Sequence, residues 1–269
     1  MISSFRKNRG LGLMELLIGV SVGMMVTYFV MNIMVTSNRS ANQSNSAAQS
    51  QETGRFILHW LTKEIHRAGY TPNEQEGRTT PMAPLCGGAA MPPAAGAACS
   101  FESTDLSDRL ALRRLYRGAT TPRDAQDCTG VNLALADDTP LVDVYWIEPN
   151  FAGAGADDNF NDVFRCVTYN ENTGTVVAPA QTLAVGVENM QILYGERDAT
   201  GRRYVSADQV NNWNNVHAVK LSILTRSFAD QAQRAQQRSF VLLDATPLTF
   251  NDTIARQIQL TTVFLTNED

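Results

Sequence analysis

The longest uninterrupted apolar run of the chain lies near its N-terminus, from Leu16 to Val35, and it contains no Asp, Glu, Lys or Arg. At a rise of 1.5 Å per residue, about 20 helical residues cover the roughly 30 Å of bilayer hydrocarbon. Arg6, Lys7 and Arg9 precede the run, and only Arg39 follows it closely. The positive-inside rule therefore predicts a single-pass membrane helix with a cytoplasmic leader and an extracytoplasmic remainder.

A secretory signal peptide is the alternative interpretation of this start, since it also pairs basic residues with an apolar core. Against it, the apolar run is longer than a signal-peptide core, and no small-x-small cleavage site follows closely. The polar segment Ser37–Gly54 comes next instead. By composition this segment resembles a flexible linker, yet it has no Pro, and Gly occurs only at its end.

Helical periodicity resumes after the polar segment, with apolar residues on one face at Ile57, Leu61, Ile65 and Ala68. A Gly and then a Pro, at positions 69 and 72, provide a stop signal. The pattern predicts one helix from about Leu13 to Ala68, on the order of 80 Å long. Its first half is apolar all round, its second half is amphipathic, and the polar middle is expected to be the weakest part.

Beyond the helix the pattern changes to irregular chain and then to strands rich in β-branched and aromatic residues. Such half-buried strands need a cover for one apolar face, and the helical stripe supplies it. The sequence therefore predicts an α+β fold, with one long helix packed on an antiparallel sheet. The expected strands are 141–148, 163–169, 190–194, 217–226 and 257–265.

The segment Arg9–Leu17, which reads Arg-Gly-Leu-Gly-Leu-Met-Glu-Leu-Leu, resembles the class III signal of type IV prepilins and type II secretion pseudopilins. This resemblance implies that a membrane prepilin peptidase cuts after Gly10 and N-methylates Leu11. Family members usually have Phe-Thr-Leu-Ile-Glu after the cut, whereas this chain has Leu-Gly-Leu-Met-Glu. The match therefore rests on Gly10, Glu15 and the apolar context.

The carboxylate of Glu15 stands at the start of the membrane span, where an isolated charge is costly and usually functional. After cleavage the new amine of Leu11 lies one helical turn away, and pairing would offset much of the cost of both charges. The resemblance to the pilin family implies that the glutamate pairs with the amine of a neighbouring subunit. Pairing with the amine of the same chain is the local alternative.

Three further segments resemble the PilW family of type IV pilus minor pilins: 183–195, the early Arg67-Ala68-Gly69-Tyr70, and 219–227, with a closing strand entered from Arg256. Together with the leader they cover both ends and much of the middle, whereas 71–136 matches no named family. The resemblance implies a pilin-like fold with a leader at 1–10, a transmembrane helix at 11–36, an amphipathic continuation at 37–69 and a head at 70–269.

The family further implies a low-abundance subunit that joins other minor pilins to prime pilus assembly at the inner membrane, next to major pilin and the assembly platform. It would then lie at or near the tip, beneath a tip adhesin, and twitching motility, adhesion and DNA uptake would depend on it indirectly. The J-type minor pseudopilin of type II secretion is the alternative, because it shares the leader and the head architecture.

The net charge and the cysteines of the chain bear on its binding partners and on its disulfide bonds. The formal net charge of −5 becomes −8 once the leader removes three cations, which argues against direct nucleic-acid binding. All four cysteines follow the span, in a compartment where disulfides persist. Of the three possible pairings, Cys86–Cys99 and Cys128–Cys166 are favoured, while a zinc site lacks any Cys-x-x-Cys or nearby His.

No sequence feature indicates an enzyme or a cofactor. The chain has three His, no Gly-x-Ser-x-Gly and no His-Glu-x-x-His. One calcium candidate is a cluster of oxygen-bearing side chains, although its spacing does not fit an EF-hand and such clusters more often form turns. The cluster consists of Asp157, Asp158, Asn159, Asn161 and Asp162.

Overall fold

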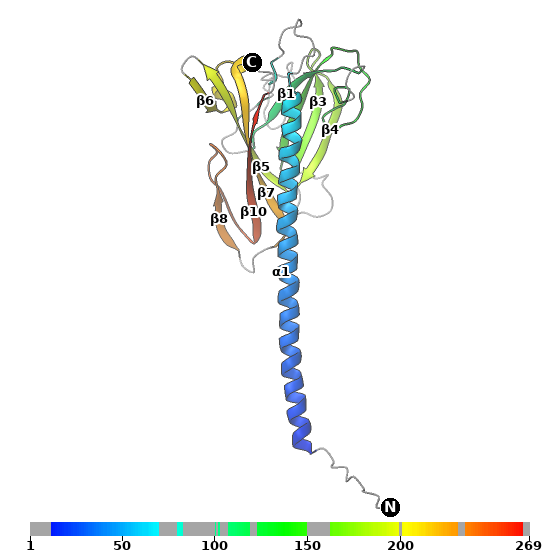
Figure 1. Ribbon diagram of the computed structural model, residues 1–269, viewed down its shortest axis with the longest axis vertical. Helices are drawn as coiled ribbons and strands as arrows, with labels where there is room; N and C mark the ends of the chain where they lie inside the picture. Colours follow the sequence, from blue (N-terminus) through cyan, green and yellow to red (C-terminus); the bar gives the residue numbers. More distant parts are fainter. Residues whose placement is uncertain are drawn as a thin grey trace, which may run out of the picture. The chain divides into compact units, whose positions relative to one another are not determined.

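A computed structural model describes residues 12–69, 80–82, 100, 102, 107–118, 123–149, 162–198, 201–230 and 235–265. The chain divides into two compact units, one up to Asn45 and one from Ser46 onward. The helix α1 (Leu13–Arg67) contributes to both, and Figure 1 draws it as one continuous helix. It is continuous through the polar segment 37–54, and its bounds agree within a residue with those that the periodicity predicts.

Residues next to each end of α1 explain where the helix begins and where it ends. The carbonyl of Gly12 accepts the amide N–H groups of Glu15 (2.9 Å) and Leu16 (3.2 Å), which starts the helical hydrogen-bond ladder. At the other end, Gly69 has a φ of +69°, the left-handed conformation that commonly terminates a helix. Its amide donates to the carbonyl of Arg113 at 2.9 Å, so the chain leaves the helix against the first strand.

The strands form two four-stranded antiparallel sheets and one separate hairpin. In the first sheet the order follows the chain: β1 (Leu110–Leu115), β2 (Pro140–Glu148), β3 (Val163–Asn170) and β4 (Val176–Val185). The second has the order β10 (Ile254–Phe264), β7 (Val216–Asp230), β5 (Val187–Asp198) and β6 (Gly201–Val205). The hairpin pairs β8 (Gln236–Phe240) with β9 (Leu248–Asp252), and two short 3₁₀ helices lie at Ala207–Gln209 and Trp213–Asn215.

The α+β class is confirmed, and all five expected strands are present, as β2, β3, β5, β7 and β10. The strands nevertheless form two sheets where a single one was expected. Gly186 separates β4 from β5 with a φ of +74°, and this backbone conformation redirects the chain from one sheet into the other.

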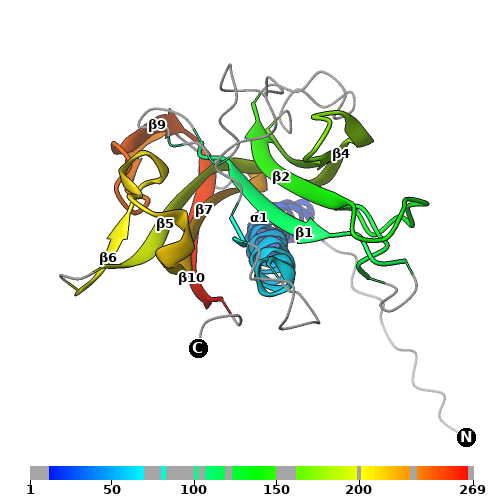
Figure 2. The same ribbon diagram turned by 90° about the horizontal axis from the view of Figure 1, so that it is seen from above.

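The main core lies where the C-terminal part of α1 meets both sheets (Figure 2). Ile57, Leu61 and Ile65 are fully buried there, as the sequence stripe predicts. They pack with inward-facing residues of both sheets, including Tyr145, Phe164, Ile192 and Leu221. A helix with apolar side chains directed toward two sheets buries a wider face than one sheet could cover.

The end of the polar segment also contacts the second sheet. Ser46, Ser50 and Gly54 recur every fourth residue and are buried, and the hydroxyl of Ser50 donates to Oγ1 of Thr225 at 3.0 Å. A Cβ on Gly54 would lie 2.2 Å from Nε2 of Gln259. The small side chains therefore allow the helix to lie close to β7 and β10.

Candidate functional site

The N-terminal part of α1 is an exposed apolar surface. Its large apolar side chains from Leu13 to Val35 are between 48% and 79% exposed. Full burial of a completely exposed side chain of this kind contributes about 1.5–3 kcal/mol, and roughly half or more of that remains to be gained at each of these positions, so water is a poor solvent for this stretch. Of the residues that the structure describes, only α1 forms a helix long and apolar enough to cross a membrane.

Glu15 lies in the first turn of this helix and is exposed. No ion pair joins its carboxylate to any other residue in the described ranges. The proposed cleavage residues Gly10 and Leu11 lie outside these ranges. The structure thus places the carboxylate at the start of the apolar surface.

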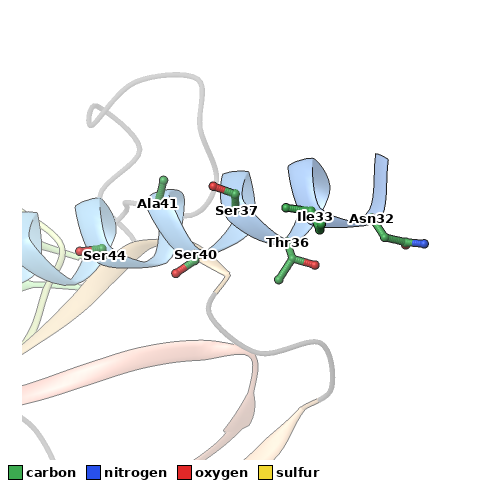
Figure 3. Close-up of a pocket in the computed structure, with 7 residues that line it drawn as sticks. All are labelled: Asn32, Ile33, Thr36, Ser37, Ser40, Ala41 and Ser44. Carbon is green, nitrogen blue, oxygen red and sulfur yellow. The ribbon is translucent and has the colours of Figure 1, made fainter. Parts of the chain in front are cut away.

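A shallow hollow follows the same helix farther along, as Figure 3 shows. Every residue that lines it belongs to α1, so the hollow is a strip of helix surface rather than an enclosed ligand pocket. Its side chains are mostly small and polar: Asn32, Ile33, Thr36, Ser37, Ser40, Ala41 and Ser44.

A buried ion-pair network fixes the other end of α1 to the first sheet. Arg67 donates to Glu64 and to Oδ2 of Asp143 (3.3 Å), and its side chain also reaches the carbonyl of Arg123 at 2.7 Å. Arg123 in turn donates to Glu64 at 2.5 Å. The side chains of Glu64 and Asp143 are only 3% and 2% exposed, so their contacts with Arg67 are desolvated, whereas the side chain of Arg123 is 47% exposed.

Asp143, on β2, is the centre of this network. Its carboxylate accepts hydrogen bonds from Nε of Arg114 on β1 (2.5 Å) and from the hydroxyl of Thr168 on β3 (2.7 Å). Burial acts to raise the pKa of Asp143, but the positive charges of Arg114 and Arg67 outweigh it and hold that pKa below its ordinary value. Asp143 is therefore a carboxylate that links the helix to three adjacent strands.

The disulfide between Cys128 and Cys166 supports the same region and confirms one of the predicted pairings. Its Cα atoms are 6.2 Å apart, and it joins the loop after β1 to β3. The amide of Cys128 donates to Oγ1 of Thr168 at 3.0 Å, which connects this loop to Asp143. The other favoured pair, Cys86–Cys99, lies outside the described residues.

A second ionic cluster joins two of the segments that resemble PilW. Arg256, at the start of the closing strand, donates to both carboxylate oxygens of Glu188 (2.5 and 2.9 Å) and to Asp252 (2.7 Å). Its guanidinium also lies 3.6 Å from the ring centroid of Phe250. The family-like residues therefore include contacts that hold β5, β9 and β10 together.

The calcium candidates fall mostly outside the described residues, which include only Asp162 of that cluster. The carbonyl of Asp162 accepts the amide of Gly186 at 3.0 Å, at the corner between the two sheets. Within the described ranges, no group of three or more His, Cys, Asp or Glu is arranged to hold a metal ion.

Sequence reasoning missed the buried network. Its one visible signal was Glu64, a charge beside the apolar stripe of Leu61 and Ile65. The partners of Glu64 and Arg67 come from loops and strands far along the chain, so no local pattern could identify them.

Comparison with known protein families gives a match for the second half of the chain. Residues 144–267 match the family described as Type IV Pilus-assembly protein W. This match begins within β2, ends just after β10 and includes Cys166, Glu188 and Arg256. No curated protein matches the chain.

Among solved structures, a type IV-like pilin from Thermus thermophilus is similar, with 16% identity and a TM-score of 0.44, over 80% of this chain and 94% of that one. The family match covers residues 144–267 of the head, and the continuous helix and antiparallel strands agree with the predicted α+β architecture. The resemblance of this chain to the PilW family of type IV pilus assembly proteins is thereby confirmed.

Proposed function

We propose that this chain is a minor pilin, cut after Gly10 and N-methylated at Leu11 by prepilin peptidase. The helix is held in the inner membrane with the head in the periplasm. The subunit then joins other minor pilins and major pilin at the assembly platform, in a complex that primes pilus assembly and supports a tip adhesin. Twitching motility, adhesion and DNA uptake follow from this role.

The observation that carries the proposal is the contrast between the two parts of α1. From Leu13 to Val35 its large apolar side chains are exposed, whereas Ile57, Leu61 and Ile65 are completely buried in the head. The exposed part needs a lipid or helical environment. The buried part ties the helix to a folded domain whose sequence matches a pilus assembly family.

Glu15 then has a role in assembly. An anion at the start of an apolar helix is costly in hydrocarbon unless a cation meets it. The amine exposed by cleavage after Gly10 supplies that cation, on the same chain or on a neighbour. A pairing between neighbours would set the axial register of the subunits.

We assign the head a structural role rather than a catalytic one. Three of its charged side chains, those of Asp143, Arg114 and Arg67, are largely buried and engaged in holding α1 against the first sheet. Groups used in this way contribute to a stable joint between helix and head. An applied load on either part is then transmitted to the other.

The test replaces Gly10 with Val in cells that assemble pili, with Gly12→Val as the matched control. A Cβ at Gly12 meets no atom within 4 Å, so the control should fold normally. We expect Gly10→Val to leave a full-length, unmethylated chain in the membrane and to reduce piliation, while Gly12→Val is processed. Normal piliation with the uncut chain would contradict the proposal.

The J-type pseudopilin alternative predicts a different phenotype in the same strains. Loss of the chain would then abolish secretion of folded exoproteins and leave piliation unchanged. Measuring both piliation and exoprotein secretion in a deletion strain separates the two machines.

A further inference from the structure

The two sheets have four edge strands, and three of these edges are protected. The edge of β1 is covered because Arg113 bonds Gly69 and Pro81 through its backbone, each at 2.9 Å. The edge strand β4 contains Pro179 and pairs with register shifts. The edge strand β6 has five residues, two of them exposed arginines. Pro, short length and charge are the usual devices against pairing with another strand.

The edge of β10 lacks these devices over its second half. The amide of Leu265 donates to the carbonyl of its partner His217 at 2.9 Å. This hydrogen bond determines which alternate residues of β10 direct their backbone N–H and C=O groups toward β7. With a regular register from Arg256 to Phe264, the odd-numbered residues direct their backbone groups toward β7. The even-numbered residues 258, 260, 262 and 264 direct theirs toward the open edge, where no described residue bonds them.

The side chains on this part of β10 are uncharged. Gln257–Phe264 contains no charge, Gly or Pro, and its exposed row includes Ile258 (40% exposed), Leu260 (54%) and Phe264 (62%). The nearest charge along β10, Arg256, is engaged by Glu188 and Asp252. Across the ladder, Lys220 of β7 pairs with Thr262, and its ammonium group lies 5.7 Å from the ring centroid of Tyr204. An exposed edge strand with a regular register and no charge of its own would promote aggregation unless another strand covers it.

We propose that the edge of β10 from Ile258 to Phe264 is a docking site for a β-strand of another pilus component. The proposal rests on the assigned role as a pilin subunit. The partner extends the second sheet by strand addition, in which main-chain hydrogen bonds supply affinity and alternate side chains supply specificity.

The edge also defines the chemistry of the occupant. Four outward residues offer backbone N–H and C=O groups at the spacing of an extended chain, so a strand satisfies them and a helix does not. The outer strand itself carries no charge from Gln257 to Phe264, which favours an uncharged partner strand, because a buried ion without a counter-charge is costly. Apolar side chains at alternate positions of that strand would contact the exposed row on β10.

The test uses the full chain in pilus-assembling cells, with the photo-crosslinking residue p-benzoylphenylalanine in place of Phe264. A control chain carries it at Val176, which is 54% exposed on β4. We expect position 264 to crosslink to another pilus component and position 176 to give no such product. N-terminal mass spectrometry of the same samples reports cleavage after Gly10 independently.

Substitutions at Thr262 test whether the contact is strand pairing. Thr262→Pro removes one outward N–H without removing a bond to β7, Thr262→Lys adds a charge to the exposed row, and Thr262→Ser is the conservative control. We expect the crosslink to be lost in the Pro and Lys variants and retained in the Ser variant, with unchanged melting temperatures.

A crosslink that survives in Thr262→Pro would overturn strand pairing, and a crosslink to a second copy of this chain or to a protein outside the pilus would overturn the choice of partner. A chain cut after Gly10 that gives no crosslink at 264 would overturn the docking site and leave the pilin role intact. An uncut chain would instead contradict the pilin role itself.

Discussion

Replacement of Asp143 by Asn tests whether the buried network holds the helix to the head. The change keeps the shape of the side chain and the hydrogen bond from Thr168, but it removes the charge that faces Arg114 and Arg67. Removing one partner of a buried pair typically costs about 3–5 kcal/mol, because the remaining charge is left without compensation.

The lower end of that range applies here. Arg114 also donates to the carbonyls of Asp124 (3.2 Å) and Gln126 (2.5 Å), so it keeps partners after the substitution. Arg67 likewise keeps Glu64. We therefore expect a loss of about 3 kcal/mol, which corresponds to a fall in Tm of roughly 6–12 °C for a domain of this size.

The assay is thermal unfolding of the full chain in detergent micelles, followed by circular dichroism. Glu52→Gln is the control, because its pair with Arg55 lies on the exposed surface and should contribute nothing measurable. If Asp143→Asn melts at the same temperature as Glu52→Gln, the network does not anchor the helix.

The pH dependence of the melting temperature independently tests whether the ionised form of Asp143 stabilises the fold. The pKa of Asp143 is held below its ordinary value of 3.8, so its stabilising contribution is present above pH 3.8 and is lost as the pH falls through the folded-state pKa. The difference in Tm between wild type and Asp143→Asn should therefore be constant from neutral pH to about pH 4.5 and shrink at more acidic pH.

Three further changes have defined outcomes. Glu15→Ala should still be cut after position 10 but incorporate poorly into pili; unchanged incorporation would refute the pairing argument. The double variant Cys128→Ser, Cys166→Ser should lose roughly 4 kcal/mol of stability, measured by urea unfolding, because the bridge spans 38 residues of chain. Burial, followed by Asp244 and Asp208, raises the pKa of Glu102 to about 7, so Glu102→Gln should raise Tm relative to wild type at pH 8 and much less at pH 5. An equal shift in Tm at both values of pH would contradict that pKa.

The elements that the sequence predicts correctly are those with strong local periodicity. The helix bounds follow from the apolar run, the stripe at Ile57, Leu61 and Ile65, and the stop at Gly69. The five predicted strands have apolar and β-branched residues in clear runs. In each case the residues that decide the structure are neighbours along the chain.

The missed elements depend on distant partners. The strand β1 contains Arg113 and Arg114, which break its apolar pattern, yet Glu171 and Asp143 on other elements neutralise them. The strands β6, β8 and β9 are polar and short, and β4 contains a Pro. The role of Ser50 and Gly54 was also missed, because small polar residues in a linker-like sequence do not reveal a sheet packed against them.

The most direct test of the proposed function is the mass of the native N-terminus. Mass spectrometry of the protein isolated from pilus-assembling cells should find a chain that begins at Leu11 and carries one added methyl group. A native chain that still begins at Met1 would contradict the proposal that this protein is a processed pilin subunit.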